Sequence, residues 1–318
     1  MSPCRLSRSR YLSPIHRSMV TRRKFAQWTA AALAGAAAAP RGWAIPGKAA
    51  RPFKLSVMLW TLRPKYTAEQ AIDLVAGAGY EGFELVDEDK KWTAEDVQRI
   101  RGRMAQLGVV CDAIAGIKTG FAETGAAQKL ADELTARMAQ AQQLGCRRII
   151  LLSGKRDSSI PRDKQHAVCI ENLQRAADVA AKHNFVLLLE PIDTLENPSI
   201  YLTKVEEAFA IARSLNSPAV QVLYDFYHQQ RGLPANSGIA PLVSPLRGNI
   251  HLLGLVHVAD VPGRHAPGTG TIDYPAIYRA LQNAGYGGWM AMEFMPTGDA
   301  AAELKKAAAE TVASAARV

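Results

Sequence analysis

Short apolar runs alternate with longer amphipathic segments from about residue 55 onward, and this alternation limits the fold more than any other feature of the chain. Apolar runs bounded by turn residues are typical of buried strands, whereas an apolar period of about 3.6 residues is typical of helices. The predicted strands are 55–60, 82–86, 109–113, 148–152, 185–190, 219–224, 252–258 and 289–293. The predicted helices are 67–78, 93–107, 126–144, 162–182, 204–215 and 274–284.

Strands that alternate with helices along a chain predict a parallel sheet with the helices packed outside it. Eight such strands in a chain of 318 residues predict the α/β class and a single (β/α)8 TIM barrel. A doubly wound open sheet is the alternative, but no Gly-x-Gly-x-x-Gly turn follows the first strand. Residues 226–250 contain several glycines and prolines and predict a long irregular connection.

The predicted helices have recognisable ends. Thr67 and Thr93 each offer a hydroxyl that can cap a helix at its first turn. A glycine follows four of the helices, where a left-handed residue commonly ends a helix before the next strand. These glycines are Gly79, Gly108, Gly145 and Gly285.

The positive charge of the chain is concentrated at its beginning. The whole chain carries a formal charge of +9, but residues 1–44 contain eight lysines and arginines and no acidic residue, which leaves +1 for the remainder. Basic surfaces that bind nucleic acid are spread over the folded domain itself. This distribution therefore argues against a nucleic-acid partner.

The basic segment is predicted to be an export leader. Residues 21–25 read Thr-Arg-Arg-Lys-Phe, a twin-arginine pattern, and an alanine-rich apolar stretch follows at 28–39. That stretch is too short for a stable membrane span, and the small residues Ala39 and Ala44 offer cleavage sites. Met19 is a candidate for the true start. A disordered basic tail is the alternative interpretation.

The predicted organisation is therefore a leader at 1–44, a linker at 45–54 and a barrel at 55–318, in a protein that is exported to the periplasm and keeps no membrane span after cleavage. Cys111, Cys146 and Cys169 would remain in the mature chain, and none lies in a Cys-x-x-Cys pair. They are expected to be core residues without a required disulfide.

Three carboxylates and one imidazole stand where predicted strands end. Glu190, Asp225, His257 and Glu293 belong to four successive strands. The carboxyl ends of barrel strands meet at one face, which is where the active sites of these barrels lie. Carboxylate oxygens and a neutral imidazole suit manganese, cobalt or magnesium better than calcium. The pattern therefore predicts a divalent-metal centre.

Each of these residues also has a plainer interpretation. Glu190 and Asp225 could cap helices, and His257 could be a core histidine. Arg264 lies in the glycine- and proline-rich loop 260–272 and could bind a substrate or simply pair with Asp260. Further candidates follow other strands: His228 and His265 as substrate contacts, Glu84 as a ligand or an orienting group, and Trp60 and Phe294 as pocket walls.

Several motifs together resemble the hydroxypyruvate isomerase family of the xylose-isomerase-like barrels. They are Leu189-Glu-Pro, Tyr224-Asp-Phe-Tyr-His-Gln, His257-Val-Ala-Asp-Val-Pro-Gly-Arg-His, Pro267-Gly-Thr-Gly, and Gly285-Tyr-Gly-Gly-Trp through Glu293. The resemblance spans about residues 55–300, and its most specific part is the loop 260–270.

The resemblance implies roles for particular residues. The metal ligands would be Glu190, Asp225, His257 and Glu293, and the two glutamates would also transfer protons. The residues His228 and Arg264 would contact the substrate. His265, the other candidate for a substrate contact, directly follows Arg264 in the same loop. Mg²⁺ or Mn²⁺ is the expected ion, with Co²⁺ or Zn²⁺ as further candidates.

Two positions depart from the family pattern. His257 stands where hydroxypyruvate isomerases often have glutamine and epimerases have histidine, and Met295 stands where a lysine often follows the last glutamate. We therefore expect a metal-dependent isomerase of the aldose–ketose or hydroxypyruvate/tartronate-semialdehyde type that forms an enediolate. A ketose 3-epimerase or inosose-processing enzyme is the alternative.

Two other classes of protein are alternatives to this expectation. A non-catalytic periplasmic sugar-binding barrel would share the fold. An apurinic endonuclease of the same superfamily would need many histidines for a trinuclear zinc site, and residues 50–165 contain none. The expected partner is a small sugar or hydroxy-keto acid, and a homo-oligomer is left open.

Overall fold

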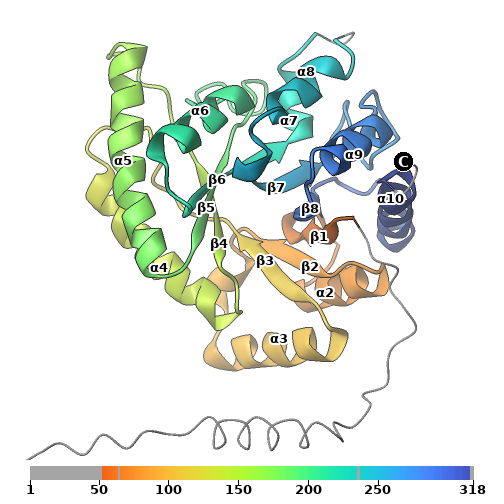
Figure 1. Cartoon of the computed structure of the whole chain (residues 1–318). Coiled ribbons are helices and arrows are strands. Elements are labelled where there is room, and N and C mark those ends of the chain that lie inside the picture. The colour runs from red at the N-terminus through yellow and green to blue at the C-terminus, as the bar shows by residue number, and fades with distance from the viewer. Residues whose placement is uncertain (1–51, 64, 235–236, 316–318) are drawn as a thin grey trace, which may run out of the picture. The chain divides into compact units, whose positions relative to one another are not determined.

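All eight predicted strands form, and they close into one parallel barrel in chain order (Figure 1). The computed structural model describes residues 52–63, 65–234 and 237–315. The strands are β1 (Lys54–Met58), β2 (Gly82–Leu85), β3 (Val110–Ile114), β4 (Arg148–Leu152), β5 (Val186–Glu190), β6 (Val220–Asp225), β7 (Leu253–Val258) and β8 (Trp289–Met292). The barrel closes where β8 pairs with β1, with Met290 opposite Leu55. The predicted TIM barrel is confirmed.

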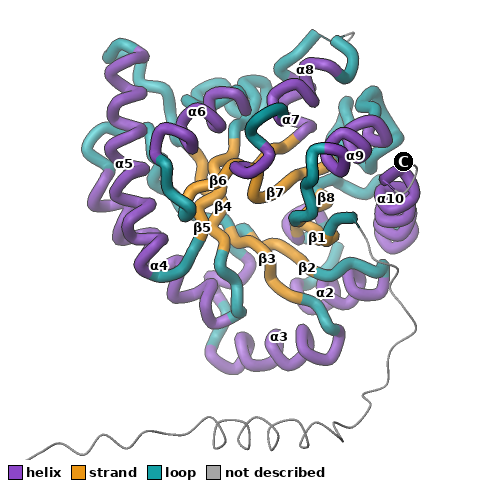
Figure 2. The backbone as a smooth tube through the Cα atoms, viewed as in Figure 1, coloured by secondary structure: helices purple, strands orange, loops and turns teal. Residues whose placement is uncertain are grey.

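The helices surround the strands, as the tube in Figure 2 shows. Six of them match the predicted segments to within a residue or two: α2 (Ala68–Gly77), α3 (Ala94–Leu107), α4 (Ala127–Gln143), α5 (Arg162–Lys182), α6 (Val205–Leu215) and α9 (Tyr274–Asn283). The predicted caps are also present. The Thr67 hydroxyl accepts a hydrogen bond from the Gln70 backbone, and Thr93 does the same for Asp96.

The prediction of an irregular connection at 226–250 is wrong in part. The segment contains α7 (Phe226–Arg231), α8 (Ala240–Val243) and the 3-10 turns η3 (Ser244–Leu246) and η4 (Ile250–Leu252). The helix α7 begins at once because the Asp225 carboxylate accepts hydrogen bonds from the Tyr227 and His228 backbone N–H groups. A side chain at the strand end therefore starts the helix without an intervening turn.

Two further 3-10 turns and one helix were not predicted: η1 (Leu59–Thr61), η2 (Glu88–Lys91) and α10 (Ala300–Ala315). The last helix is rich in alanine, so its apolar period is weak. It is held by tertiary contacts that include a hydrogen bond from the Tyr80 hydroxyl to the Leu304 carbonyl, at 2.8 Å.

The predicted leader at 1–44 lies outside the described residues, as does most of the predicted linker. The strand β1 begins at Lys54, the last residue of that linker. None of the helices in the described part of the chain is long and apolar enough to span a membrane.

Two apolar layers make up the core. A large cluster lies between the strands and the helices and includes Cys111, Cys146 and Cys169, which are buried as expected. A smaller cluster fills the barrel interior and contains Met58, Ala113, Ile150, Leu188, Leu223, Leu255, Trp289 and Ala291. Trp289 packs directly against Gly82, where an added Cβ would lie 2.7 Å from the indole ring.

The Arg137 guanidinium on α4 joins two strand ends at the barrel mouth. It forms a two-pronged ion pair with Asp89, at 2.6 and 2.9 Å, and donates to the Ala115 carbonyl at 2.7 Å and the Val86 carbonyl at 3.1 Å. The side chains of Arg137 and Asp89 are 3% and 5% exposed. The loops after β2 and β3 therefore depend on one buried charge.

We predict that Arg137→Met lowers the free energy of unfolding by about 3–5 kcal/mol, because it leaves the Asp89 carboxylate buried without its partner. Urea unfolding followed by circular dichroism measures the change. Arg103→Met is the control, because its ion pair with Asp73 lies on the surface, with side chains 40% and 44% exposed. That variant should lose much less stability, because exposed ion pairs contribute little. Similar losses in both variants would contradict this role for Arg137.

Candidate active site

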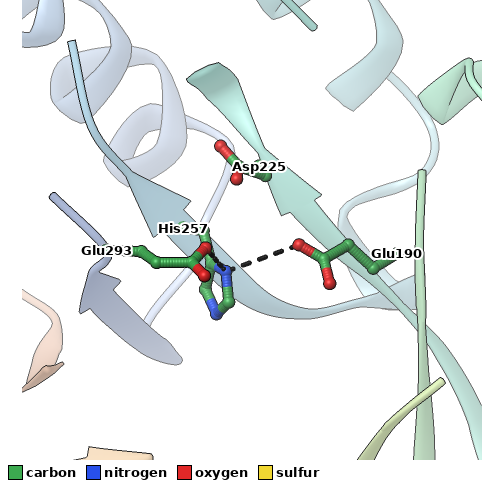
Figure 3. Close-up of side chains that lie close together, drawn as sticks. All are labelled: Glu190, Asp225, His257 and Glu293. Carbon is green, nitrogen blue, oxygen red and sulfur yellow. Dashed lines mark hydrogen bonds and ion pairs between the residues drawn. The ribbon is translucent and has the colours of Figure 1, made fainter. Parts of the chain in front are cut away.

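Four predicted ligands converge at the carboxyl end of the barrel. Glu190 ends β5, Asp225 ends β6, His257 lies in β7, and Glu293 follows β8. One ligand atom from each lies within 4.8 Å of the others, and all four residues are buried. In Figure 3 the two glutamates approach His257 from opposite sides, and Asp225 lies above them. The four predicted ligands therefore come together at one point of the barrel mouth.

The charged groups of this cluster shift one another's pKa values. The His257 Nδ1 atom lies 2.7 Å from Glu293 and 3.6 Å from Glu190. Burial would raise the pKa of Glu293, but the Arg264 guanidinium and His257 outweigh it and hold that pKa well below its ordinary value. Burial raises the pKa of Glu190, which His257 offsets only in part. The two glutamates therefore differ in how readily they hold a proton.

The composition of the cluster fits a divalent cation. Within the described residues, the only ionic contact of the Glu190 carboxylate is His257 at 3.6 Å, which is too long for a hydrogen bond. The three buried carboxylates have two imidazoles, His257 and His228, and the Arg264 guanidinium as close partners. An acidic group this deeply buried requires compensation, which a cation between the carboxylates would supply. Carboxylate and imidazole are ligands of manganese, magnesium, cobalt and zinc.

Glu84 orients His257 and does not belong to the group of potential ligands. Its side chain extends from β2 across the barrel interior, is fully buried, and places Oε2 2.9 Å from the His257 Nε2 atom. When Nε2 donates its proton to this carboxylate, the lone pair of Nδ1 faces Glu190 and Glu293. Such a partner fixes the tautomer and the ring orientation of a metal-binding histidine. The sequence left both roles open for Glu84, and the geometry supports the orienting role.

Arg264 faces the cluster, so the alternative that it pairs with Asp260 is wrong. Its Nη2 atom lies 2.6 Å from Glu293 and 3.3 Å from Asp225, and its Nη1 atom lies 2.8 Å from Glu196. Asp260 instead binds its own loop, because its carboxylate accepts hydrogen bonds from the backbone N–H groups of Gly268, Gly270 and Ile272. The ordered loop holds Arg264 over the site.

His228 links the cluster to the loop after β5. Its Nε2 atom lies 3.4 Å from Asp225, and its Nδ1 atom lies 2.7 Å from Asp193. Burial alone would lower the pKa of His228, but the Asp225 and Asp193 carboxylates outweigh it and raise the pKa to about 9. Asp225 thus combines both roles considered for it, since it caps α7 with one oxygen and faces the cluster with the other.

The remaining candidates are Trp60, His265 and Phe294, and they differ in whether they line the cavity. The Trp60 indole N–H donates to Glu293 at 2.7 Å, and the ring lines the cavity. His265 does not line the cavity, and its Nδ1 atom lies 3.0 Å from the Met295 carbonyl oxygen. Phe294 is buried in the core and does not line the cavity either. Of the three, only Trp60 stands where a substrate could reach it.

A cavity of about 300 Å³ opens next to the cluster and is lined by Met58, Trp60, Val86, Ala115, Gly116, Ile117, Ile150, Leu152, Glu190, Ile192, Glu196, His228, Arg264 and Glu293. Glu196 was not predicted, nor was Asp193, which supports His228 from behind. Both lie in the loop after β5, where no strand end marks them.

Comparison with known proteins places the chain in a class and then in a family. The family model described as "Xylose isomerase-like TIM barrel" matches residues 72–314, so the chain belongs to that family. It is 31% identical over 265 residues to the "Putative hydroxypyruvate isomerase" of Homo sapiens, a match that covers 78% of this chain and 91% of that protein. The chain therefore belongs to the hydroxypyruvate isomerase family, a family of isomerases.

Other relatives match over a shorter length. The hydroxypyruvate isomerase of Escherichia coli (strain K12) is 30% identical over 172 residues, which is 54% of this chain and 64% of that protein. The 2-oxo-tetronate isomerase of Cupriavidus necator is 30% identical over 161 residues, which is 51% of this chain and 60% of that protein. The chain thus spans less than two thirds of these two relatives.

Solved structures of similar fold carry different names. The crystal structure of "AP endonuclease, family 2" from Brucella melitensis has a TM-score of 0.70 at 26% identity, covering 80% of this chain and 98% of that one. The crystal structure of "IOLI protein with a binding zinc atom" has a TM-score of 0.68 at 17% identity, covering 83% and 98%, and it shows the fold alone.

Proposed function

We propose that the protein is a metal-dependent isomerase that moves a proton between neighbouring carbons of a small hydroxy-carbonyl compound, of the aldose–ketose or hydroxypyruvate/tartronate-semialdehyde type. The observation that carries the proposal is the placement of two buried glutamates on opposite sides of one potential metal centre (Figure 3). The membership of the chain in a family of isomerases supports it.

The metal would be held by Glu190, Asp225, His257 and Glu293, and Mg²⁺ or Mn²⁺ is the proposed ion, with Co²⁺ or Zn²⁺ as further candidates. A divalent ion there would act as a Lewis acid that makes the proton next to the substrate carbonyl easier to remove and stabilises the resulting enediolate. The proposed role of Glu84 is to keep His257 in the tautomer whose Nδ1 lone pair is free.

Glu293 is the proposed base. The Arg264 guanidinium and the Trp60 indole N–H both contact its carboxylate, and they hold it ionised and in a fixed orientation. Glu190 is the proposed group that returns a proton to the neighbouring carbon, because it lies on the other side of His257 from Glu293 (Figure 3). A base on one side and an acid on the other can remove a proton from one carbon and return a proton to its neighbour.

His228 and Arg264 are the proposed contacts for substrate oxygens. Both line the cavity, and both carry N–H donors next to the potential ligands. The raised pKa of His228, about 9, keeps the ring protonated near neutral pH, so that it can donate to a carbonyl or carboxylate oxygen. For His265 the contact with the Met295 carbonyl leaves a substrate role without geometric support.

A ketose 3-epimerase or inosose-processing enzyme is the second candidate. The observation in its favour is the pair of opposed glutamates, since an epimerase removes a proton from one face of a carbon and returns it to the other. An apurinic endonuclease is less compatible with the site, because each of the two groups of potential metal ligands in the described residues contains one histidine and the cavity is lined by three glutamates. Nucleic-acid phosphates would be repelled by this charge.

We predict that Glu190→Gln and Glu293→Gln each lower turnover by about 100-fold or more, because the amide keeps the size of the side chain but can neither take up nor deliver the proton. Turnover and deuterium uptake from solvent into the substrate can both be followed by NMR. A site with two proton-transfer groups and one of them removed should still exchange a proton from one side while isomerisation fails. Turnover near the wild-type rate in both variants, with metal bound, would favour a binding protein without catalysis.

Export by the twin-arginine route is a separate proposal, which rests on residues 21–25 in the part of the chain that the structure does not describe. We predict that changing Arg22 and Arg23 together to lysine retains the precursor in the cytoplasm, because the pathway reads the arginine pair and not charge alone. Cell fractionation and immunoblotting measure the distribution. Normal periplasmic appearance of the double variant would contradict this route.

A further inference from the structure

We infer that Asp112 is a positioning residue that acts on His257 through Glu84. In this arrangement the Asp112 carboxyl group carries a proton and donates it in a hydrogen bond to Glu84, so that Glu84 remains the acceptor for the His257 Nε2 proton. The inference rests on the proposed function in one respect, because His257 is a metal ligand there. It goes further by giving a role to a residue that does not line the cavity.

An irregularity in the sheet places Asp112 inside the barrel. The strands β2 and β3 pair regularly through Phe83, but Glu84 then pairs with Ala113, so Asp112 is an extra residue in β3. Ala113 belongs to the interior cluster, and the Asp112 Oδ2 atom accepts a hydrogen bond from the Ser56 hydroxyl of β1 at 3.2 Å. Two consecutive residues of β3 therefore face inward, although side chains of a regular strand alternate. Bulges redirect side chains in this way, and this one turns a carboxyl group toward the neighbourhood of Glu84.

Two buried carboxyl oxygens have no hydrogen-bond partner among the described residues. They are the Oε1 atom of Glu84 and the Oδ1 atom of Asp112. The other oxygen of each group is bound, by His257 at 2.9 Å and by Ser56 at 3.2 Å. Two unpaired carboxylate oxygens in a barrel interior would be costly. A single proton held between them satisfies both, because one oxygen then donates and the other accepts.

The surroundings assign this proton to Asp112. Glu84 forms an ion pair with His257, whereas Asp112 forms none within the described residues. The Arg148 guanidinium donates to the backbone carbonyl of Asp112 at 3.0 Å. Burial, and after it the negative charge of Glu84, raise the pKa of Asp112 well above its ordinary value, and Arg148 offsets only part of this. Asp112 is therefore protonated near neutral pH and acts as the donor.

The position of this proton matters for the metal centre. With Oε1 bound by Asp112, Glu84 accepts the His257 proton through Oε2, and the His257 Nδ1 atom faces the other ligands. If Asp112 were ionised, two like charges would repel each other in a medium of low polarity, and Glu84 would lose its fixed position. Groups that orient a metal-binding histidine in this way typically change metal affinity by about 10- to 100-fold.

Infrared spectroscopy tests where the proton lies, and it does so without metal. The difference spectrum between wild-type protein and Asp112→Asn near neutral pH should contain the C=O band of one protonated carboxyl group. Any band from Glu190 is common to both proteins and cancels. The band should shift in Glu84→Gln, because the partner of the Asp112 hydroxyl changes. Two ionised carboxylates bridged by water would give no such band, and that result would overturn the inference.

Metal affinity tests whether Asp112 acts through Glu84. Calorimetric titration of the metal-free protein with Mn²⁺ gives Kd for each variant. Asp112→Val removes the donor and should weaken binding by about tenfold or more. Asp112→Asn keeps an N–H that can donate to Glu84, so Kd should stay within about threefold of wild type. Ser56→Ala, the control on the other side of Asp112, should also stay within about threefold.

A double variant separates positioning from a general structural effect. Adding Asp112→Val to Glu84→Gln should weaken Mn²⁺ binding little beyond Glu84→Gln alone, because residues that act through one another are not additive. Full additivity would overturn the inference, as would equal losses in Asp112→Val and Asp112→Asn. Thermal melting checks folding, and the infrared band with Asp112→Asn decides the matter if Asp112→Val does not fold.

The outcomes also separate this inference from the proposed function. A missing carboxyl band in protein that binds Mn²⁺ would overturn the role of Asp112 and leave the proposed function in place. Wild-type protein that binds no Mn²⁺ would contradict the proposed function and, with it, the role of Asp112 at the metal centre.

Discussion

The site depends on how the barrel holds several negative charges together in its interior. Glu190, Asp225 and Glu293 are all buried within a few ångströms of one another, and like charges at that distance repel strongly in a medium of low polarity. Arg264 and His228 neutralise part of this charge, and Glu84 orients His257. The remaining negative charge is the physical reason to place a cation there. Most other interactions at the barrel mouth hold these residues in position.

The support is divided between the two halves of the barrel. In the second half, Asp260 orders the loop that carries Arg264, and Asp193 holds His228. In the first half, the buried Arg137–Asp89 pair fixes the ends of β2 and β3, where Val86 and Ala115 line the cavity. All the charged residues that line the cavity therefore come from the second half of the barrel, and most of the apolar ones come from the first half.

The fold and the four potential ligands could be predicted from the sequence because they follow from local patterns. Parallel strands of a closed barrel end at the same face, so Glu190, Asp225, His257 and Glu293 had to meet once the strands were recognised. The capping residues Thr67 and Thr93 act within their own first turn and were equally visible. In these cases the signal itself, a strand end or a first helical turn, lies within a short stretch of sequence.

Contacts that join distant loops could not be predicted in this way. The pairing of Arg264 with Glu196 and Glu293 depends on the conformation of two loops, and sequence proximity wrongly suggested Asp260 as a partner. The contact of Glu84 with His257 depends on which side chains of β2 and β7 point inward across the barrel. The helix α7 was missed because its cap, Asp225, is also the last residue of a strand.

The central claim is that this cluster binds a divalent ion, and the metal content of the purified protein tests it most directly. Elemental analysis of protein prepared without chelator should find about one divalent ion per chain. Asp225→Asn should lose that ion yet keep its fold, since the amide oxygen can still cap α7, and Glu84→Gln should weaken binding by about 10- to 100-fold. Asp273→Asn, which alters the cap of α9 away from the site, should retain full occupancy. Wild-type protein without metal, or full occupancy in Asp225→Asn, would contradict the account.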